Sequence, residues 1–294
     1  MYCQHYGFTE RPFEITPDAK FLYMTRGHRE ALATLIYGIR ERRGFIAMVG
    51  DVGTGKTTLL RAALRRLGKM TKSAFIFNSE MPFDQVLLMI LDDLCLLKPG
   101  ESLPPHRAVK RLYYFAIRWF ARGGNLVIAI DEAQNFSRKT LESFRQISNL
   151  ETDKHRLIQI VLAGQTELDQ RLDCPELRSF VQRINLKRYV KPLSQDETYA
   201  YLDHRLKKIN YQGPPLFDLR AKQLIWHYSK GVPRMINNVC ENALLIGYGT
   251  GKRQITGHEV GEAIKDLTYS PSKRPENIET KQRKIIPFLR AANN

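Results

Sequence analysis

Short apolar runs alternate with longer amphipathic segments along the first two thirds of the chain. Runs of five to seven residues rich in apolar side chains are typical of buried strands, and they predict strands at 45–49, 73–77, 126–130, 157–163 and 184–190. Apolar residues spaced three and four positions apart predict helices, at 27–43, 57–67, 83–97, 106–122 and 137–150. The pattern therefore indicates an α/β unit.

Beyond residue 193 only helical periodicity remains. Ser194 and Glu197 have the spacing of a capping box at the start of the first helical segment. The predicted helices are 195–210, 218–229, 234–248 and 256–267. A second, all-helical domain is therefore expected after the α/β unit.

A glycine-rich loop lies between the first predicted strand and the helix that follows it. It matches the phosphate-loop pattern G-x-x-x-x-G-K-[ST], whose backbone N–H groups and helix start surround an anion. The predicted nucleotide-binding residues are Gly50, Asp51, Val52, Gly53, Thr54, Gly55, Lys56, Thr57 and Thr58. We expect Lys56 to reach the β- and γ-phosphates of ATP and Thr57 to bind Mg²⁺.

Two further predicted strands end in residues suited to nucleotide chemistry. The strand 126–130 runs directly into Asp131 and Glu132. Asp131 is expected to hold Mg²⁺ through water, and Glu132 to orient and deprotonate the attacking water. The strand 157–163 leads to Gln165, which would touch the γ-phosphate or that water. Together with the phosphate loop, these residues predict an ATPase site.

The chain divides into four predicted parts. These are an N-terminal arm without regular structure (1–26), the ATPase core (27–193), the helical domain (194–267) and a basic, flexible tail (268–294). Aromatic residues recur in the arm, and we expect them to pack it onto the main domain. The alternative is that one of them borders the adenine.

The chain carries an excess of positive charge. With 46 Lys and Arg against 30 Asp and Glu, the net charge is +16. This favours binding to nucleic acid or an anionic membrane, with a solvated basic surface as the alternative. In the helix 106–122, four arginines fall within an arc of roughly 60°, a row suited either to phosphates or to solvent. They are Arg107, Arg111, Arg118 and Arg122.

Several features predict a cytoplasmic protein. No apolar stretch approaches the length of a transmembrane segment, and the N-terminus lacks the pattern of a signal peptide. The four cysteines are scattered, without the spacing of a metal or redox motif.

A series of short motifs resembles the ExeA/GspA family of bacterial AAA+ ATPases. The motifs are Tyr6-Gly7-Phe8, Gly44-Phe45, residues 50–58, residues 130–135, Ser148-Asn149-Leu150-Glu151-Thr152, Gly164-Gln165, Gln182-Arg183-Ile184 and Gly231-Val232-Pro233-Arg234. The resemblance covers roughly residues 1–267. It implies a five-stranded parallel sheet flanked by helices, a smaller helical lid, ATP and Mg²⁺ as cofactors, and a homo-oligomeric ring or filament.

The resemblance also implies roles for single residues in catalysis. Asn78 would restrain the catalytic glutamate until the oligomer assembles, and Gln165 would sense the γ-phosphate. Arg183, with Arg178 as the alternative, would be the arginine finger given to a neighbour's nucleotide. Arg234 would contact the γ-phosphate from the lid.

Three functional hypotheses follow. In the first, the protein is a DNA-associated ATP switch that binds double-stranded DNA without sequence preference and recruits a partner such as a transposase, as TnsC- and MuB-type ATPases do. In the second, it is an ExeA/GspA-like ATPase that acts on a protein component of secretion or envelope assembly. The third, a nucleotide-binding scaffold without turnover, is disfavoured by the presence of Glu132 and Arg183. The charge favours the first hypothesis and the family resemblance favours the second.

Overall fold

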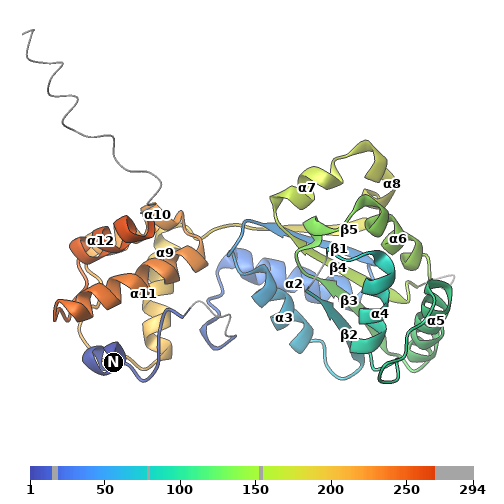
Figure 1. Ribbon diagram of the computed structural model, residues 1–294, viewed down its shortest axis with the longest axis horizontal. Coiled ribbons are helices and arrows are strands. Elements are labelled where there is room, and N and C mark those ends of the chain that lie inside the picture. The colour runs from blue at the N-terminus through green and yellow to red at the C-terminus, as the bar shows by residue number, and fades with distance from the viewer. Residues whose placement is uncertain (15–18, 78–79, 152–154, 269–294) are drawn as a thin grey trace, which may run out of the picture.

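A computed structural model describes residues 1–14, 19–77, 80–151 and 155–268 (Figure 1). Asn78 and the predicted tail from residue 269 onward lie outside the described residues. None of the helices that the structure describes has the length and apolarity of a membrane span.

The described strands, five in number, form one parallel sheet. They are β1 (Phe45–Gly50), β2 (Thr71–Ile76), β3 (Asn125–Ile130), β4 (Ile158–Gly164) and β5 (Ile184–Val190), in the spatial order β2-β3-β4-β1-β5. Because all neighbouring pairs are parallel, the segments that follow β1, β3 and β4 emerge at the same end of the sheet. Open α/β sheets bind their ligands at this carboxyl end.

Helices cover both faces of the sheet (Figure 1). One face is covered by α2 (Arg26–Arg40) and α3 (Lys56–Arg65). The other is covered by α4 (Phe83–Asp93), α5 (Pro105–Ala121), α6 (Arg138–Ser148), α7 (Thr166–Leu172) and α8 (Arg178–Val181). Phe136, Phe144 and Phe180 are fully buried on this second face, and each such ring contributes roughly 2–3 kcal/mol through burial. The predicted α/β fold is confirmed.

Some predicted boundaries differ from the structure. The helix expected at 83–97 ends at Asp93, because Cys95 adopts a left-handed backbone with φ of 55°. The helices α7 and α8 are absent from the sequence prediction, since segments of seven and four residues are too short to show a helical period.

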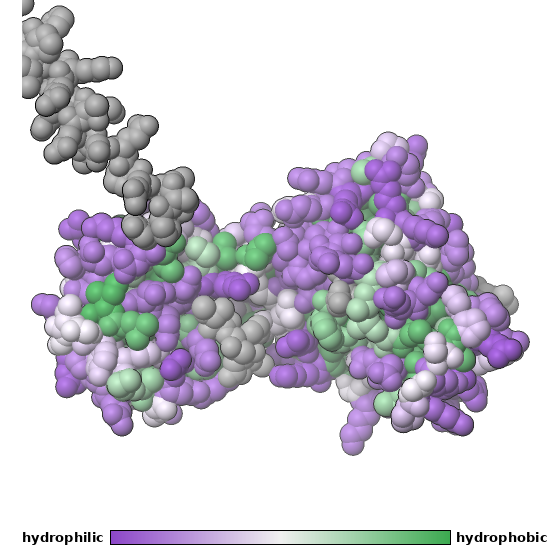
Figure 2. Space-filling model, viewed as in Figure 1, coloured by the Kyte–Doolittle hydropathy of each residue, from purple (hydrophilic) through white to green (hydrophobic). Residues whose placement is uncertain are grey.

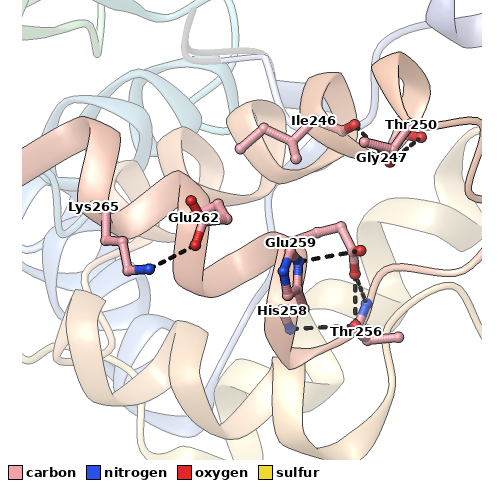
Figure 3. A network of polar contacts seen from close by, with 8 residues as sticks. All are labelled: Ile246, Gly247, Thr250, Thr256, His258, Glu259, Glu262 and Lys265. Atoms are coloured by element: carbon pink, nitrogen blue, oxygen red, sulfur yellow. Dashed lines mark hydrogen bonds and ion pairs between the residues drawn. The ribbon is translucent and has the colours of Figure 1, made fainter.

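A separate helical unit follows β5. It contains α9 (Gln195–Lys208), α10 (Leu219–Ser229), α11 (Pro233–Gly249) and α12 (Gly257–Thr268). Ser194 and Glu197 form the predicted capping box of α9. Hydrophilic side chains cover much of both units on the face shown in Figure 2. At α12, Glu259 accepts hydrogen bonds from the backbone N–H and hydroxyl of Thr256 (Figure 3), which fixes the start of that helix.

The described aromatic residues of the N-terminal arm pack on the helical unit. Its buried aromatic residues are Tyr2, Tyr6, Phe8, Phe13 and Phe21, and they share one apolar cluster with side chains of α9 to α12. The arm begins with a short helix, α1 (Tyr2–Tyr6), in a segment predicted to lack regular structure. The Tyr6 hydroxyl donates to the carbonyl oxygen of Leu244 on α11 at 3.1 Å. The prediction that the arm packs onto the main domain is therefore wrong, because periodicity does not reveal which core an aromatic segment joins.

Candidate active site

The phosphate loop joins β1 to α3 at the carboxyl end of the sheet. Gly53 and Gly55 have φ of 78° and 97°, values that favour glycine. At Gly50, a Cβ atom would lie only 2.5 Å from the carbonyl oxygen of Val190 on β5. The glycines therefore permit the backbone path that lets N–H groups and the start of α3 surround an anion.

Lys56 is held inside this loop. It is 5% exposed, and its Nζ donates to the carbonyl oxygens of Gly50 and Asp51 at 2.8 and 2.9 Å. Burial lowers the pKa of Lys56, and the nearby carboxylates of Glu132 and Asp131 partly oppose that effect. The result is a preplaced cation among backbone groups, an arrangement suited to phosphate.

Thr57 and Asp131 form the part of the site that fits a metal ion. The Thr57 hydroxyl donates to Oδ2 of Asp131 at 2.6 Å. Burial raises the pKa of Asp131, although hydrogen bonds from Thr57 and from the backbone N–H of Glu132 act in the opposite direction. Hydroxyl and carboxylate oxygens are ligands that Mg²⁺ prefers. Within the described ranges no group of three or more His, Cys, Asp or Glu could hold a metal.

Glu132 is fixed by two amide side chains. Its Oε2 accepts hydrogen bonds from Nε2 of Gln134 at 2.6 Å and from Nε2 of Gln165 at 2.8 Å. Burial raises the pKa of Glu132, but these two hydrogen bonds and the charge of Lys56 outweigh burial and hold the pKa below its ordinary value. The carboxylate is therefore ionised and directed, as a general base requires.

Gln134 is a site residue to which the sequence analysis assigned no role. It is 7% exposed, and its Oε1 also accepts a hydrogen bond from the backbone N–H of Gln165 at 3.0 Å. The signal in the sequence was its position two residues after Glu132. Spacing alone does not show that the amide turns back to the carboxylate, because that depends on the short 3-10 helix Ala133–Asn135.

A cavity of about 440 Å³ lies between the phosphate loop and the helical unit. Lys56, Thr58 and Glu132 line it from the core, and Arg234 lines it from the start of α11. The backbone N–H of Arg234 donates to the carbonyl oxygen of Gly53 at 3.4 Å. The structure thus brings predicted phosphate-binding residues, Thr57, Glu132 and Arg234 around one cavity of ligand size. Asp131 and Gln165 do not line it but are hydrogen-bonded to Thr57 and Glu132.

The remaining wall of the cavity comes from the arm and the helical unit. Phe21, Tyr23 and Arg205 line it, and this placement supports the alternative that an arm aromatic borders the adenine. His28 also lines it, with Nε2 3.3 Å from the carbonyl oxygen of Thr54. Burial lowers the pKa of His28, so the ring is neutral at pH 7.

The two candidate arginine fingers do not line this cavity. Arg183 precedes β5 at the amino end of the sheet, where Ile184 pairs with Phe45 at the beginning of β1. The length of β1 separates that end from the phosphate loop by roughly 20 Å. Arg183 donates to Oγ of Ser148 at 3.4 Å, and Arg178 is exposed on α8. Neither is among the described residues that line the cavity.

The predicted arginine row lies on α5. Arg107, Arg118 and Arg122 are exposed. Arg111 is partly buried and forms an ion pair with Glu101, with Nη2 2.8 Å from Oε1. The charge of Arg111 is therefore paired within the chain, and Arg107, Arg118 and Arg122 are the exposed members of the row.

Comparison with known proteins agrees with this geometry. A family model described as an AAA domain matches residues 39–172. The chain is 37% identical over 273 residues to general secretion pathway protein A from Aeromonas hydrophila. That alignment covers 91% of this chain and 49% of the relative, so the chain spans about half the length of the protein it matches.

Solved structures share the fold at low sequence identity. Drosophila ORC bound to DNA has a TM-score of 0.66 at 18% identity, covering 89% of this chain and 65% of that chain. The RuvB Holliday junction branch migration motor of Thermotoga maritima has a TM-score of 0.56 at 16% identity, covering 90% and 76%. Identities this low show the fold alone. The AAA domain match and the alignment over nine tenths of this chain show that it contains an AAA domain and is similar in sequence to ExeA/GspA-type AAA+ proteins.

Proposed function

We propose that this protein binds ATP with Mg²⁺ and hydrolyses it as part of a homo-oligomer. The observation that carries the proposal is the Glu132 carboxylate, which two amides direct beside Lys56 and the Thr57–Asp131 pair. A nucleotide-binding scaffold would not need an ionised, directed carboxylate at this point.

Each group has a defined task in this proposal. Lys56 and the N–H groups of the loop bind the β- and γ-phosphates, and Arg234 approaches the γ-phosphate from the lid. Glu132 accepts the proton of the attacking water, while Gln134 and Gln165 keep its carboxylate in place. Bound Mg²⁺ supplies positive charge to the phosphate oxygens, and Thr57 and Asp131 are the residues that would hold it.

The distance of Arg183 from its own cavity supports hydrolysis between subunits. An arginine finger acts on the charge that develops on the transferred phosphoryl group. At roughly 20 Å along the strands from its own phosphate loop, Arg183 would reach only the nucleotide of another copy. Turnover would then depend on assembly.

The test is ATP turnover of the wild type against Glu132→Gln. Loss of the base should lower turnover by about 10²- to 10⁴-fold while ATP binding is retained. The matched control is Glu41→Gln, an exposed carboxylate at the end of α2 and at the opposite end of the sheet, which should leave turnover nearly unchanged. An active Glu132→Gln variant would overturn the site assignment.

For the biological role, we propose control of a protein client in secretion or envelope assembly, from a cytoplasmic location. The support is the 37% identity to a protein named for the general secretion pathway. In this role, ATP turnover should respond to a protein partner and be indifferent to DNA.

A second role, a DNA-associated switch that recruits a partner such as a transposase, is favoured by the exposed Arg107, Arg118 and Arg122. Double-stranded DNA should then stimulate ATP turnover, and the stimulation should fade steeply with salt. If ATP turnover does not respond to DNA, the DNA-associated role is contradicted and the protein-client role remains.

A further inference from the structure

Positive charge gathers at the amino end of the sheet, opposite the phosphate loop. Each of the turns that lead into β1 to β5 contributes Arg or Lys, whereas Glu41 and Glu151 are the described acidic residues of these turns. We call this surface the amino edge. Its members are Arg40, Arg42, Arg43, Arg65, Arg66, Lys69, Lys72, Arg122, Arg156 and Arg183.

The cations of the amino edge are not neutralised by neighbouring carboxylates. In the part of the chain that the structure describes, no salt bridge involves any of them. Arg65, Arg66 and Lys69 are exposed and make no side-chain hydrogen bond within the described residues. Their charge therefore remains available to an external anion.

Contacts between the turns make the amino edge one continuous surface. Arg156 Nη1 donates to the carbonyl oxygen of Arg43 at 2.7 Å and connects the turns before β4 and β1. Arg42 Nη2 donates to the carbonyl oxygen of Gly124 at 2.6 Å and connects the turns before β1 and β3. Arg40 reaches the carbonyl oxygen of Arg66 at 3.5 Å, at the turn before β2.

Aromatic rings lie beneath several of these cations. Arg42 lies 4.6 Å from the ring centroid of Phe120, and Lys72 lies 5.6 Å from that of Trp119. The Trp119 indole N–H donates to the carbonyl oxygen of Met70 at 3.2 Å. Phe120 and Trp119 are partly buried beneath these cations, so the charged groups and not these two rings face an external partner.

We propose that the amino edge binds the phosphodiester backbone of double-stranded DNA without sequence preference. Strands about 4.8 Å apart make the edge roughly 20 Å wide, a length over which B-DNA carries roughly a dozen phosphate charges. The inference rests on the DNA-associated role proposed above. It places the DNA contact at the amino edge of the sheet and not on the arginine row of α5. Arg65, Arg66 and Lys69 of the edge are not among the residues proposed for ATP hydrolysis, so DNA binding through them can be tested separately from ATP turnover.

The experiment measures binding of a labelled 30-base-pair duplex by fluorescence anisotropy over a salt series. The edge variant is Arg65→Ala, Arg66→Ala and Lys69→Ala in one chain. The matched control, Lys207→Ala, Lys208→Ala and Arg220→Ala, removes the same charge from exposed positions of the helical unit. A third variant, Arg107→Ala with Arg118→Ala, tests the α5 row.

Three lost phosphate contacts should make the slope of log affinity against log salt shallower by about 2.7. Between 50 and 200 mM salt, affinity should then change by roughly 40-fold less than in the wild type. An equal loss of DNA affinity in the control variant would mean that only the net charge matters. A loss confined to the α5-row variant would mean that DNA binds at α5. Either result overturns the proposal. So does binding to phosphatidylserine vesicles without binding to DNA. ATP turnover, measured in the same preparations without DNA, reports separately on the proposed ATPase.

Discussion

At the carboxyl end of the sheet, Lys56 donates to two carbonyl oxygens and Glu132 accepts from two amides. At the amino end, Arg65, Arg66 and Lys69 make no side-chain hydrogen bond or ion pair within the described residues. The same strands separate both sets, so the difference does not come from the fold class. It comes from whether each polar side chain is buried with partners or left in solvent.

This difference separates two kinds of function. Buried, mutually bonded groups hold one geometry, and each of them is expensive to remove because its partners lose their hydrogen bonds. Exposed cations without partners, such as Arg65, Arg66 and Lys69, hold no fixed geometry, and each adds a small increment to the attraction of a polyanion. The carboxyl end should therefore respond strongly and non-additively to mutation, and the amino edge weakly and additively.

The largest effect is expected for Lys56→Ala. Two charge-assisted phosphate contacts at about 2 kcal/mol each correspond to roughly 10³-fold weaker nucleotide binding, and turnover should be abolished. Titration with a fluorescent ATP analogue measures binding. Lys72→Ala at the amino edge is the control, and a similar loss there would contradict the separation of the two ends.

Arg183→Ala tests whether the amino end of the sheet in one subunit contacts the nucleotide at the carboxyl end of the sheet in another. Removing an arginine finger should lower turnover by about 10³-fold or more, with ATP binding unchanged. Mixing Arg183→Ala with Lys56→Ala should restore part of the turnover, because one subunit keeps the phosphate loop and the other keeps the finger. Arg178→Ala, on the neighbouring α8, serves as the comparison. If mixing restores activity only in combination with Arg178→Ala, the finger is Arg178.

Gln134→Leu and Gln165→Leu should each lower turnover by roughly 10-fold. The loss in the double variant should be smaller than the product of the two single losses, because both amides bind Oε2 of Glu132. Each loss removes a hydrogen bond that depresses the pKa of Glu132. The acid limb of the pH–rate profile should therefore move to higher pH, because the base must be deprotonated. Gln146→Leu, an exposed amide on α6, should change neither the rate nor the profile.

The sequence predicted the part of the site that depends on local backbone geometry. The phosphate loop, Asp131 and Glu132 follow strands and glycines whose pattern can be counted along the chain. The partnership of Gln134 and Gln165 could not be predicted in the same way, because it joins the ends of β3 and β4. The packing of the arm on α11 was also missed, since it joins residues more than 200 positions apart. The amino edge could not be predicted from the sequence, because its cations lie in and beside five separate turns that come together only in the folded sheet.

The smallest effects are expected for single substitutions in the amino edge. Arg65→Ala and Arg66→Ala should each make the salt slope of DNA binding shallower by about 0.9, equivalent to a change of roughly 3.5-fold between 50 and 200 mM salt. Their double variant should show the product of the two effects, because neither side chain shares a described partner with the other. ATP turnover without DNA should stay at the wild-type rate in all three. A strong coupling between these arginines would mean that the edge holds a fixed geometry of its own, and the contrast between the two ends of the sheet would then fail.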